Sequence, residues 1–191
     1  MSRLAFIDIE TTGFSRQWDY IIEIAALLYD TEEKKVIKEF HEYIKPGKNI
    51  PAKITEITGI TNAMVADARD EVEVLTDFVE WMTLNKIDAT VGHNIERFDR
   101  DFIKVRCGRY SIPMFESEYI DTLKIAREKK IPVTMKTATG RPSYKQEALA
   151  NFYGIVYQAH SAIEDVKALI KIYEEMTSKK TIEKRRKSLG F

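Results

Sequence analysis

The chain has 191 residues, of which 44% are hydrophobic and 31% charged, and its formal net charge is +0. This composition suits one compact domain and argues against a protein that coats long stretches of nucleic acid, since such proteins carry a positive excess. No apolar run approaches the roughly 20 residues that cross a bilayer. The start shows no signal-peptide pattern, and the single cysteine, Cys107, excludes an internal disulfide. We therefore expect a monomeric, cytoplasmic protein without membrane contact, with one domain over residues 1–176 and a basic tail over residues 177–191.

Three strands are predicted at the start of the chain. Residues 4–9 form a short apolar run with β-branched and aromatic side chains that ends at the turn-forming residues 11–13. A second apolar run covers residues 20–29, and after a polar turn residues 36–44 interleave polar and apolar side chains. Such a succession is typical of an antiparallel meander whose last strand lies nearest the edge of the sheet.

Helices and short strands alternate after this meander. Helical spacing is carried first by Val72, Leu75, Val79 and Met82, and later by Ile95, Phe98, Phe102 and Val105. Short strands are predicted at residues 89–92 and 119–120, a loop at residues 131–142, and two further helices from about residue 144 and about residue 162. The order of elements predicts an α/β fold in which helices flank a mixed sheet.

Two acidic residues, Asp8 and Glu10, lie at the carboxyl end of the first predicted strand. Side chains alternate along a strand, so both carboxylates point to the same side of the sheet. Two like charges side by side in a core cost on the order of several kcal/mol unless a proton or a cation neutralises them. The spacing therefore indicates either a cation site or a strand end that reaches solvent.

A third acid, Asp99, falls on the apolar stripe of the second predicted helix, between Ile95 and Phe102. Its charged neighbours are expected to face solvent. A carboxylate on an apolar face is held by an arginine or a backbone amide, or it belongs to a functional site. The position alone leaves both interpretations open.

The last predicted helix begins with a base and an acid close together. Ser161 and Glu164 match a capping box with Ser161 as the N-cap, so His160 directly precedes the helix and Asp165 lies in its first turn. In many helices these two positions carry an apolar pair that closes the helix start. A histidine and an aspartate there indicate either a functional pair or an ordinary ion pair.

Phosphodiester hydrolysis would unite these residues. Carboxylates repel phosphate, so an acidic pocket can act on nucleic acid only through bound cations, and hard oxygen ligands favour Mg²⁺ or Mn²⁺. Two such ions about 4 Å apart can clamp the attacking and leaving oxygens of an in-line displacement. The carboxylates of Asp8, Glu10, Asp99 and Asp165 would balance the charge of two divalent ions. Histidine changes its protonation near neutral pH, which suits His160 to take a proton from the attacking water.

Three segments resemble the motifs of the DEDDh 3′-to-5′ exonuclease family. They are Asp8-Ile9-Glu10-Thr11-Thr12-Gly13-Phe14, then His93-Asn94 followed by Phe98-Asp99, then His160-Ser161-Ala162 with Asp165 and Ala168. Within that family the pattern is most similar to bacterial DNA polymerase III proofreading exonucleases, either the epsilon subunit or the exonuclease domain of the Gram-positive replicative polymerase. The likeness extends over residues 4–171. Phe14 and Gln146 depart from it, because leucine is common at both positions.

The resemblance implies a ribonuclease-H-like fold and two divalent metal ions. It implies Asp8, Glu10 and Asp165 as ligands of the first ion, with Asp8 shared with the second, Asp99 as an outer ligand and His160 as the general base.

Substrate contacts are implied by the same resemblance. The backbone of Thr11, Thr12 and Gly13 would receive the terminal 3′ nucleotide, and Phe14 would wedge against its base. His93 and Asn94 would contact the substrate as well.

We therefore expect a metal-dependent 3′-to-5′ exonuclease that shortens single-stranded DNA or a frayed 3′ end, releases nucleoside 5′-monophosphates and has a DNA polymerase as a candidate partner. One alternative is an RNA exonuclease of the ribonuclease T or oligoribonuclease kind. Another is a non-catalytic relative that binds nucleic acid, against which the five intact reactive positions argue.

Two basic segments keep open interpretations. The tail, residues 177–191, carries six cations against one acid and is either a solvated helix end or a contact for phosphate or a partner. The loop at residues 129–145, with Lys136, Arg141 and Lys145, is interpreted as plain surface in preference to a substrate contact.

Overall fold

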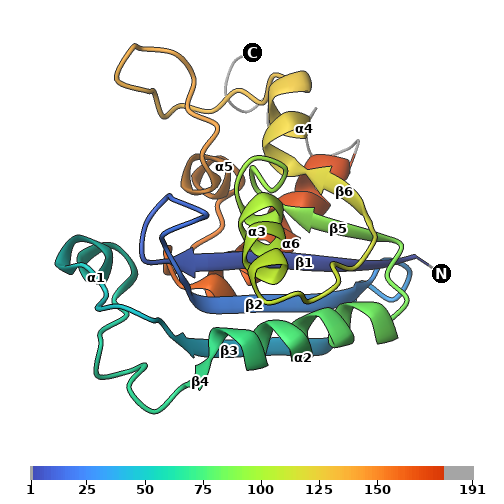
Figure 1. Cartoon of the computed structure of the whole chain (residues 1–191). Helices are drawn as coiled ribbons and strands as arrows, with labels where there is room; N and C mark the ends of the chain where they lie inside the picture. The colour runs from blue at the N-terminus through green and yellow to red at the C-terminus, as the bar shows by residue number, and fades with distance from the viewer. Residues whose placement is uncertain (1, 179–191) are drawn as a thin grey trace.

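A computed structural model describes residues 2–178 of the chain. Six strands form a mixed sheet in the order β4-β3-β2-β1-β5-β6, which confirms the predicted α/β architecture (Figure 1). β1 pairs antiparallel with β2, β2 pairs antiparallel with β3, and β1, β5 and β6 run parallel. The strands are β1 (Arg3–Thr11), β2 (Ile21–Asp30), β3 (Lys35–Lys45), β4 (Arg69–Asp70), β5 (Ala89–Gly92) and β6 (Glu118–Asp121). The meander is confirmed, and only the two-residue β4 lies beyond β3.

The described part of the chain contains the predicted helices and two further short ones. The helices are α1 (Ala52–Thr58), α2 (Glu71–Leu84), α3 (Asp99–Arg109), α4 (Thr122–Glu128), α5 (Gln146–Tyr153) and α6 (Ala162–Thr177). α1 and α4 were not predicted; each has 7 residues, too few for a periodic apolar pattern to become visible.

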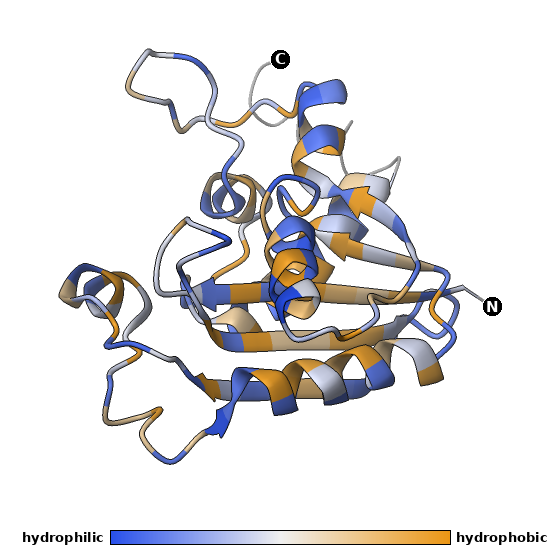
Figure 2. Cartoon of the chain, in the orientation of Figure 1, coloured by the Kyte–Doolittle hydropathy of each residue, from blue (hydrophilic) through white to orange (hydrophobic). Residues whose placement is uncertain are grey.

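The side chains of β1 divide between two apolar cores, one on each face of the sheet. Ala5, Ile7 and Ile9 pack with buried residues of α2 and α3, whereas Leu4 and Phe6 pack with buried residues of α6. Figure 2 shows hydrophobic and hydrophilic residues alternating along α2, as expected for a helix that buries one face. The face of β1 that carries Leu4 and Phe6 therefore points toward α6 throughout.

The predicted apolar stripes are partly wrong. Val72 and Val105 are 36% and 38% exposed, although both were placed on buried helix faces. α3 begins only at Asp99, so Ile95 and Phe98 precede it and the 3.6-residue spacing counted from Ile95 does not continue into the helix. The buried positions of α3 are instead Asp99, Phe102, Ile103, Arg106 and Cys107.

Within residues 2–178, no helix is both long enough and apolar enough to cross a membrane. Residues 179–191, which hold the charged part of the predicted tail, lie outside the described residues.

Candidate active site

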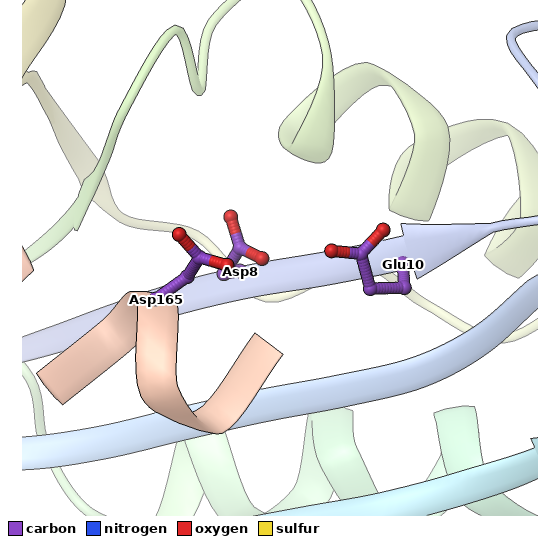
Figure 3. Close-up of side chains that lie close together, drawn as sticks. All are labelled: Asp8, Glu10 and Asp165. Carbon is purple, nitrogen blue, oxygen red and sulfur yellow. The ribbon is translucent and has the colours of Figure 1, made fainter. Parts of the chain in front are cut away.

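Three carboxylates converge where β1 ends beside the start of α6. Each of Asp8, Glu10 and Asp165 offers an oxygen, and these oxygens all lie within 4.8 Å of one another. Figure 3 shows Asp165 extending from the first turn of α6 toward Asp8, with Glu10 further along β1. Because Leu4 and Phe6 of the same strand face already pack against α6, strand alternation brings Asp8 and Glu10 to that helix as well.

The fourth predicted acid, Asp99, lies at the first position of α3 and is 3% exposed. Its carboxylate accepts a hydrogen bond from the backbone amide of Ile9. Asp99 lines the same cleft as the other three acids, and its charge is the largest electrostatic contribution to the raised pKa of Asp8 after burial. Asp99 therefore has a hydrogen-bond donor in the Ile9 backbone and also lies with the other three acids in the cleft.

The acids form the floor of a cleft with a volume of about 970 Å³. Its lining includes Asp8, Glu10, His93, Asn94, Phe98, Asp99, Arg127, Arg141, Lys145, Gln146, Glu147, His160 and Asp165. The floor is therefore acidic, whereas the wall contributed by α4 and the loop before α5 carries cations. A phosphate in this cleft would meet attractive side chains on the wall and repulsive ones on the floor.

Burial raises the pKa of each acid on the floor. Burial is the largest cause in every case; it raises the pKa of Asp8 well above its usual range, that of Glu10 to about 8, that of Asp99 to about 7 and that of Asp165 to about 6. Neighbouring carboxylates add to the shift of Asp8 and Glu10. Bound cations would favour the ionised form of all four carboxylates.

His160 lies at the rim of the cleft in a left-handed backbone conformation, with φ at 67° and its side chain 48% exposed. Its backbone N–H donates to Asp165 Oδ2 at 2.7 Å, while the imidazole Nε2 lies 3.6 Å from Glu147 Oε1. The expected pairing of His160 with Asp165 is thus made by the backbone, and the ring is directed to Glu147.

The capping box predicted at the start of α6 is wrong. Ser161 is the N-cap residue, but its side chain makes no capping hydrogen bond, and Glu164 pairs with Lys167 instead of reaching back. The buried Glu23 of β2 accepts from the backbone N–H of Ala162 at 2.9 Å and also contacts His41 Nε2 at 2.8 Å. A carboxylate from a distant strand therefore holds the helix start, which no local pattern could reveal.

Gln146, a residue that sequence reasoning did not place in the site, orients Asp165. Its side-chain amide donates to Asp165 Oδ1 at 2.8 Å and to the Asp165 main-chain oxygen at 3.0 Å. With the His160 amide on Oδ2, both carboxylate oxygens have a donor. The only signal in the sequence was a polar residue where leucine is frequent in the resembling family.

The loop after β1 carries the residues predicted to receive the terminal nucleotide. Thr11 and Thr12 are buried, and their hydroxyls donate within the loop, Thr11 Oγ1 to Gly13 O at 2.6 Å and Thr12 Oγ1 to Asp19 Oδ1 at 3.1 Å. A Cβ atom on Gly13 would lie 2.5 Å from Asp19 Oδ2, so any other residue there would displace the Asp19 carboxylate that Thr12 and Ser15 bind. None of residues 11–14 lines the cleft itself.

Phe14 stands at the mouth of the cleft. Its side chain is 83% exposed, and its ring makes an edge contact with Phe98, which lines the cleft, at a centroid distance of 6.2 Å. An exposed aromatic ring in this position is placed to meet a flat ligand entering the cleft.

His93 and Asn94, the other predicted substrate contacts, both line the cleft. His93 Nδ1 lies 2.9 Å from Thr122 Oγ1, and burial lowers the pKa of His93, which favours its neutral form. Asn94 adopts φ of 65° and its backbone N–H donates to Asp121 Oδ1 at 3.0 Å. Both residues are thus held by the end of β6 and the start of α4.

Part of the loop of residues 129–145, which the sequence analysis interprets as plain surface, lines the cleft. Residues of this loop that line the cleft are Thr137, Thr139, Arg141, Pro142, Ser143, Tyr144 and Lys145. The loop was not assigned because it carries no apolar periodicity and its partners lie far away in the sequence. Its position favours the alternative that it contacts substrate.

The model of an exonuclease family, RNase_T, matches residues 5–173. The chain is 35% identical over 173 residues to DNA polymerase III PolC-type from Caldanaerobacter subterraneus subsp. tengcongensis, which covers 90% of this chain and 11% of that protein. It is 36% identical over 171 residues to the protein of the same name from Staphylococcus aureus, with coverage of 88% and 11%. The chain thus spans only a small part of these relatives.

Solved structures give the same fold. A product-bound structure of exonuclease I has a TM-score of 0.78 at 25% identity, covering 98% of this chain and 45% of that one. E. coli exonuclease I in complex with a dA16 oligonucleotide has a TM-score of 0.75 at 24% identity, covering 98% and 43%. The matched family model, the PolC-type relatives and the sheet that brings the four acids together agree, and the chain belongs to the RNase_T exonuclease family, of the DEDDh type.

Proposed function

We propose that the protein removes nucleotides from the 3′ end of single-stranded DNA, or of a frayed end, and releases nucleoside 5′-monophosphates in a reaction that requires two divalent metal ions. The observation that carries the proposal is the convergence of Asp8, Glu10 and Asp165 within 4.8 Å, with Asp99 lining the same cleft. The family likeness supports exonuclease chemistry, and the placement of the acids supports its dependence on metal.

The side chains present fit such ions. The donors are carboxylate oxygens, which Mg²⁺ and Mn²⁺ prefer, and a bound cation would offset the burial that raises the pKa values of Glu10, Asp99 and Asp165. When bound, two divalent ions would supply charge neutralisation and polarise the phosphate. Asp8, Glu10 and Asp165 would hold the first ion, Asp8 would be shared with the second, and Asp99 would act from the outer side.

Other side chains of the cleft are proposed to transfer the proton and to bind the phosphates. His160 at the rim takes the proton of the attacking water, and Glu147, 3.6 Å from its Nε2, stabilises the protonated ring. Arg127, Arg141 and Lys145 of the opposite wall attract the phosphates of the strand. General base catalysis of this kind typically contributes about 10²- to 10⁴-fold in rate.

Phe14 and the loop after β1 are proposed to select the chain end. Phe14 makes an edge contact with Phe98 beside the cleft, and its exposed ring is where a base would stack. The backbone of Thr11, Thr12 and Gly13 would approach the terminal nucleotide, with His93 and Asn94 contacting it from the β5 side. A cleft that receives a terminus in this way acts on ends and not on internal bonds.

DNA is proposed over RNA because two relatives that share 35% and 36% identity with this chain are DNA polymerase III PolC-type proteins, and because exonuclease I is found in complex with dA16 and dT13 oligonucleotides. The same relatives support a DNA polymerase as partner, with proofreading as the role.

The test uses four matched substrates: DNA and RNA oligonucleotides of one sequence, each with a free or a phosphate-blocked 3′ end. With Mg²⁺ or Mn²⁺, the free DNA should shorten one nucleotide at a time from its 3′ end, and the blocked DNA should persist. Degradation that continues in EDTA, or that survives Asp165→Ala, would overturn the metal-dependent mechanism. Faster degradation of RNA would assign the protein to the RNA alternative.

A further inference from the structure

A second hollow lies outside the active-site cleft, between the loop of residues 13–19 and α3. It has a volume of about 280 Å³ and is lined by Arg16, Gln17, Trp18, Val105, Arg106 and Arg109. None of these residues lines the cleft that holds the acids. The loop follows the carboxyl end of β1, the strand that carries Asp8 and Glu10 (Figure 1). The segment that borders the hollow is therefore continuous with the strand that contributes two acids to the cleft.

Trp18 is the most unusual residue of this hollow because its side chain is 70% exposed. Tryptophan is highly buried in most folded proteins, and leaving its large apolar ring in water forgoes a substantial gain in free energy. Trp18 belongs to none of the apolar clusters formed by the described residues. Its ring is therefore available to a ligand with a flat apolar face.

The most exposed charges around the hollow are positive. In residues 13–19 and 95–109, the charged residues classed as exposed are Arg97, Lys104 and Arg109, all of them cations. The partly exposed acids of these segments are each paired with a cation, Asp19 with Lys48, Glu96 with Lys124 and Asp101 with Arg100. A local positive surface in a chain of net charge +0 attracts polyanions to one place.

The walls of the hollow are already held in position. Arg109 Nη1 donates to Gln17 O at 3.1 Å, and Arg16 donates to Arg97 O, so two arginines tie the loop to α3 and to the residues before it. Arg106 lies fully buried beneath the hollow and forms an ion pair with Glu71. Its Nη1 has no hydrogen-bond partner among the described residues. The side chains of Arg109 and Arg16 are thus already ordered, so binding a ligand would cost little of their conformational entropy.

We propose that this hollow binds the single-stranded nucleic acid on the 5′ side of the nucleotide being removed, with a base stacked on Trp18 and a phosphate held by Arg109. Aromatic rings beside arginines are the usual means of binding single strands without sequence preference. The inference rests on the proposed function, which places the 3′ end in the cleft.

The position of α3 gives the length of strand required. Asp99, at one end of the helix, lines the cleft, and Arg109, at the other end, lines the hollow. The 11 residues of α3 span about 16 Å. A strand with its bases stacked at about 3.4 Å per nucleotide covers that distance in about five nucleotides. Substrates of three nucleotides would therefore not reach the hollow, whereas those of fifteen would.

The binding test measures the affinity of a fluorescent 15-nucleotide DNA strand in EDTA. Trp18→Ala should weaken binding about 5- to 100-fold, and Trp18→Phe should recover most of the loss because it keeps an aromatic face. Leu84→Ala, at an apolar side chain that is 69% exposed on α2, is the matched control. Arg109→Gln should reduce the slope of log affinity against log salt by about 0.7, whereas Arg69→Gln on β4 should leave it unchanged.

The cleavage test separates this inference from the proposed function. With Mn²⁺, Trp18→Ala should slow removal of the first nucleotide from the 15-nucleotide strand and leave cleavage of a trinucleotide at the wild-type rate. Wild-type protein that cleaves neither substrate would overturn the proposed function. The binding test would still show whether Trp18 and Arg109 bind single-stranded DNA. Equal binding by Trp18→Ala and wild type, or a Trp18→Ala effect confined to self-association in sedimentation, overturns the nucleic-acid assignment.

Discussion

The carboxyl end of β1 and the segment that leads into α6 place their functional groups in opposite ways. Asp8 lies on a strand with paired neighbours on both sides, β2 and β5, and its carboxylate faces other acids. His160 lies on a connection at positive φ, with a half-exposed ring whose nearest charged neighbour, Glu147, is 3.6 Å away. Asp8 is thus fixed by a strand that is paired on both sides, whereas the histidine is fixed mainly through its backbone.

Because of this difference, substitutions of the acids and of His160 should affect stability differently. Repulsion among the acids of the floor opposes folding, because the sheet does not let them move apart. The exposed ring of His160 contributes little to packing, so its removal should leave the free energy of unfolding nearly unchanged. Substitutions at the strand end should therefore change stability and activity together, and those at His160 activity alone.

The largest effect is expected for Asp8→Asn. Loss of the ligand that we propose to be shared by two metal ions should remove several kcal/mol of transition-state stabilisation, a decrease of about 10³-fold or more in rate. The same change removes one repulsive charge, so the metal-free variant should melt at a higher temperature than wild type at pH 8. Single-turnover rates on 3′-labelled DNA and thermal melts in EDTA measure the two effects. Asp77→Asn, at an exposed acid of α2 that pairs with Arg69, should change neither.

Replacement of the histidine tests the other half of the comparison. His160→Asn should reduce the rate about 10²- to 10⁴-fold, while the melting temperature and its increase with Mn²⁺ stay at wild-type values. Asparagine tolerates the left-handed conformation at φ 67°, and the backbone N–H that binds Asp165 remains. His160→Gly, which removes the ring and relaxes the backbone, should match it in rate. A fall in stability as large as the fall in activity would show that His160 acts on the fold.

The pH dependence of stability should distinguish the floor from the rest of the molecule. Folding raises the pKa of Glu10 to about 8 and that of Asp99 to about 7, so between pH 5 and 8 the folded state holds more protons than the unfolded chain. The free energy of unfolding in EDTA should therefore decrease as pH rises, by an amount on the order of several kcal/mol, since one pKa unit corresponds to about 1.4 kcal/mol. Urea unfolding at several pH values measures the slope. Glu10→Gln should flatten it, and Mn²⁺ should restore stability mainly at pH 8.

A smaller effect is expected from Gln146→Leu, which removes the side chain that orients Asp165 and installs an apolar residue of similar size. Groups that position metal ligands typically contribute about 10- to 100-fold to affinity or activity. The rate should fall within that range, and the Mg²⁺ concentration that gives half-maximal activity should rise. Gln158→Leu, at an exposed glutamine, is the control. A wild-type metal requirement in Gln146→Leu would show that Asp165 needs no such donor.

Residues whose role depends on short-range geometry were predictable from the sequence. Alternation along β1 was enough to place Asp8 and Glu10 on one side, and the strand–helix order was enough to predict a mixed sheet. Residues whose role depends on a distant partner were not. Gln146 acts through a contact 19 residues away, and Glu23 caps α6 from 139 residues away. The predicted phase of α3 failed because a turn separates Ile95 from the helix.

The smallest expected effect tests the corrected start of α6. A side chain that truly caps a helix contributes about 1 kcal/mol, which Ser161 should not do, because the carboxylate of Glu23 accepts the amide of Ala162 in its place. Ser161→Ala should therefore lower the free energy of unfolding by less than about 0.5 kcal/mol. Asp70→Ala is the matched comparison, since Asp70 caps α2 by accepting from the Glu73 amide at 2.9 Å, and it should cost about 1 kcal/mol. Urea unfolding at one pH compares the two variants, and equal losses would restore Ser161 as the cap and leave Glu23 without that role.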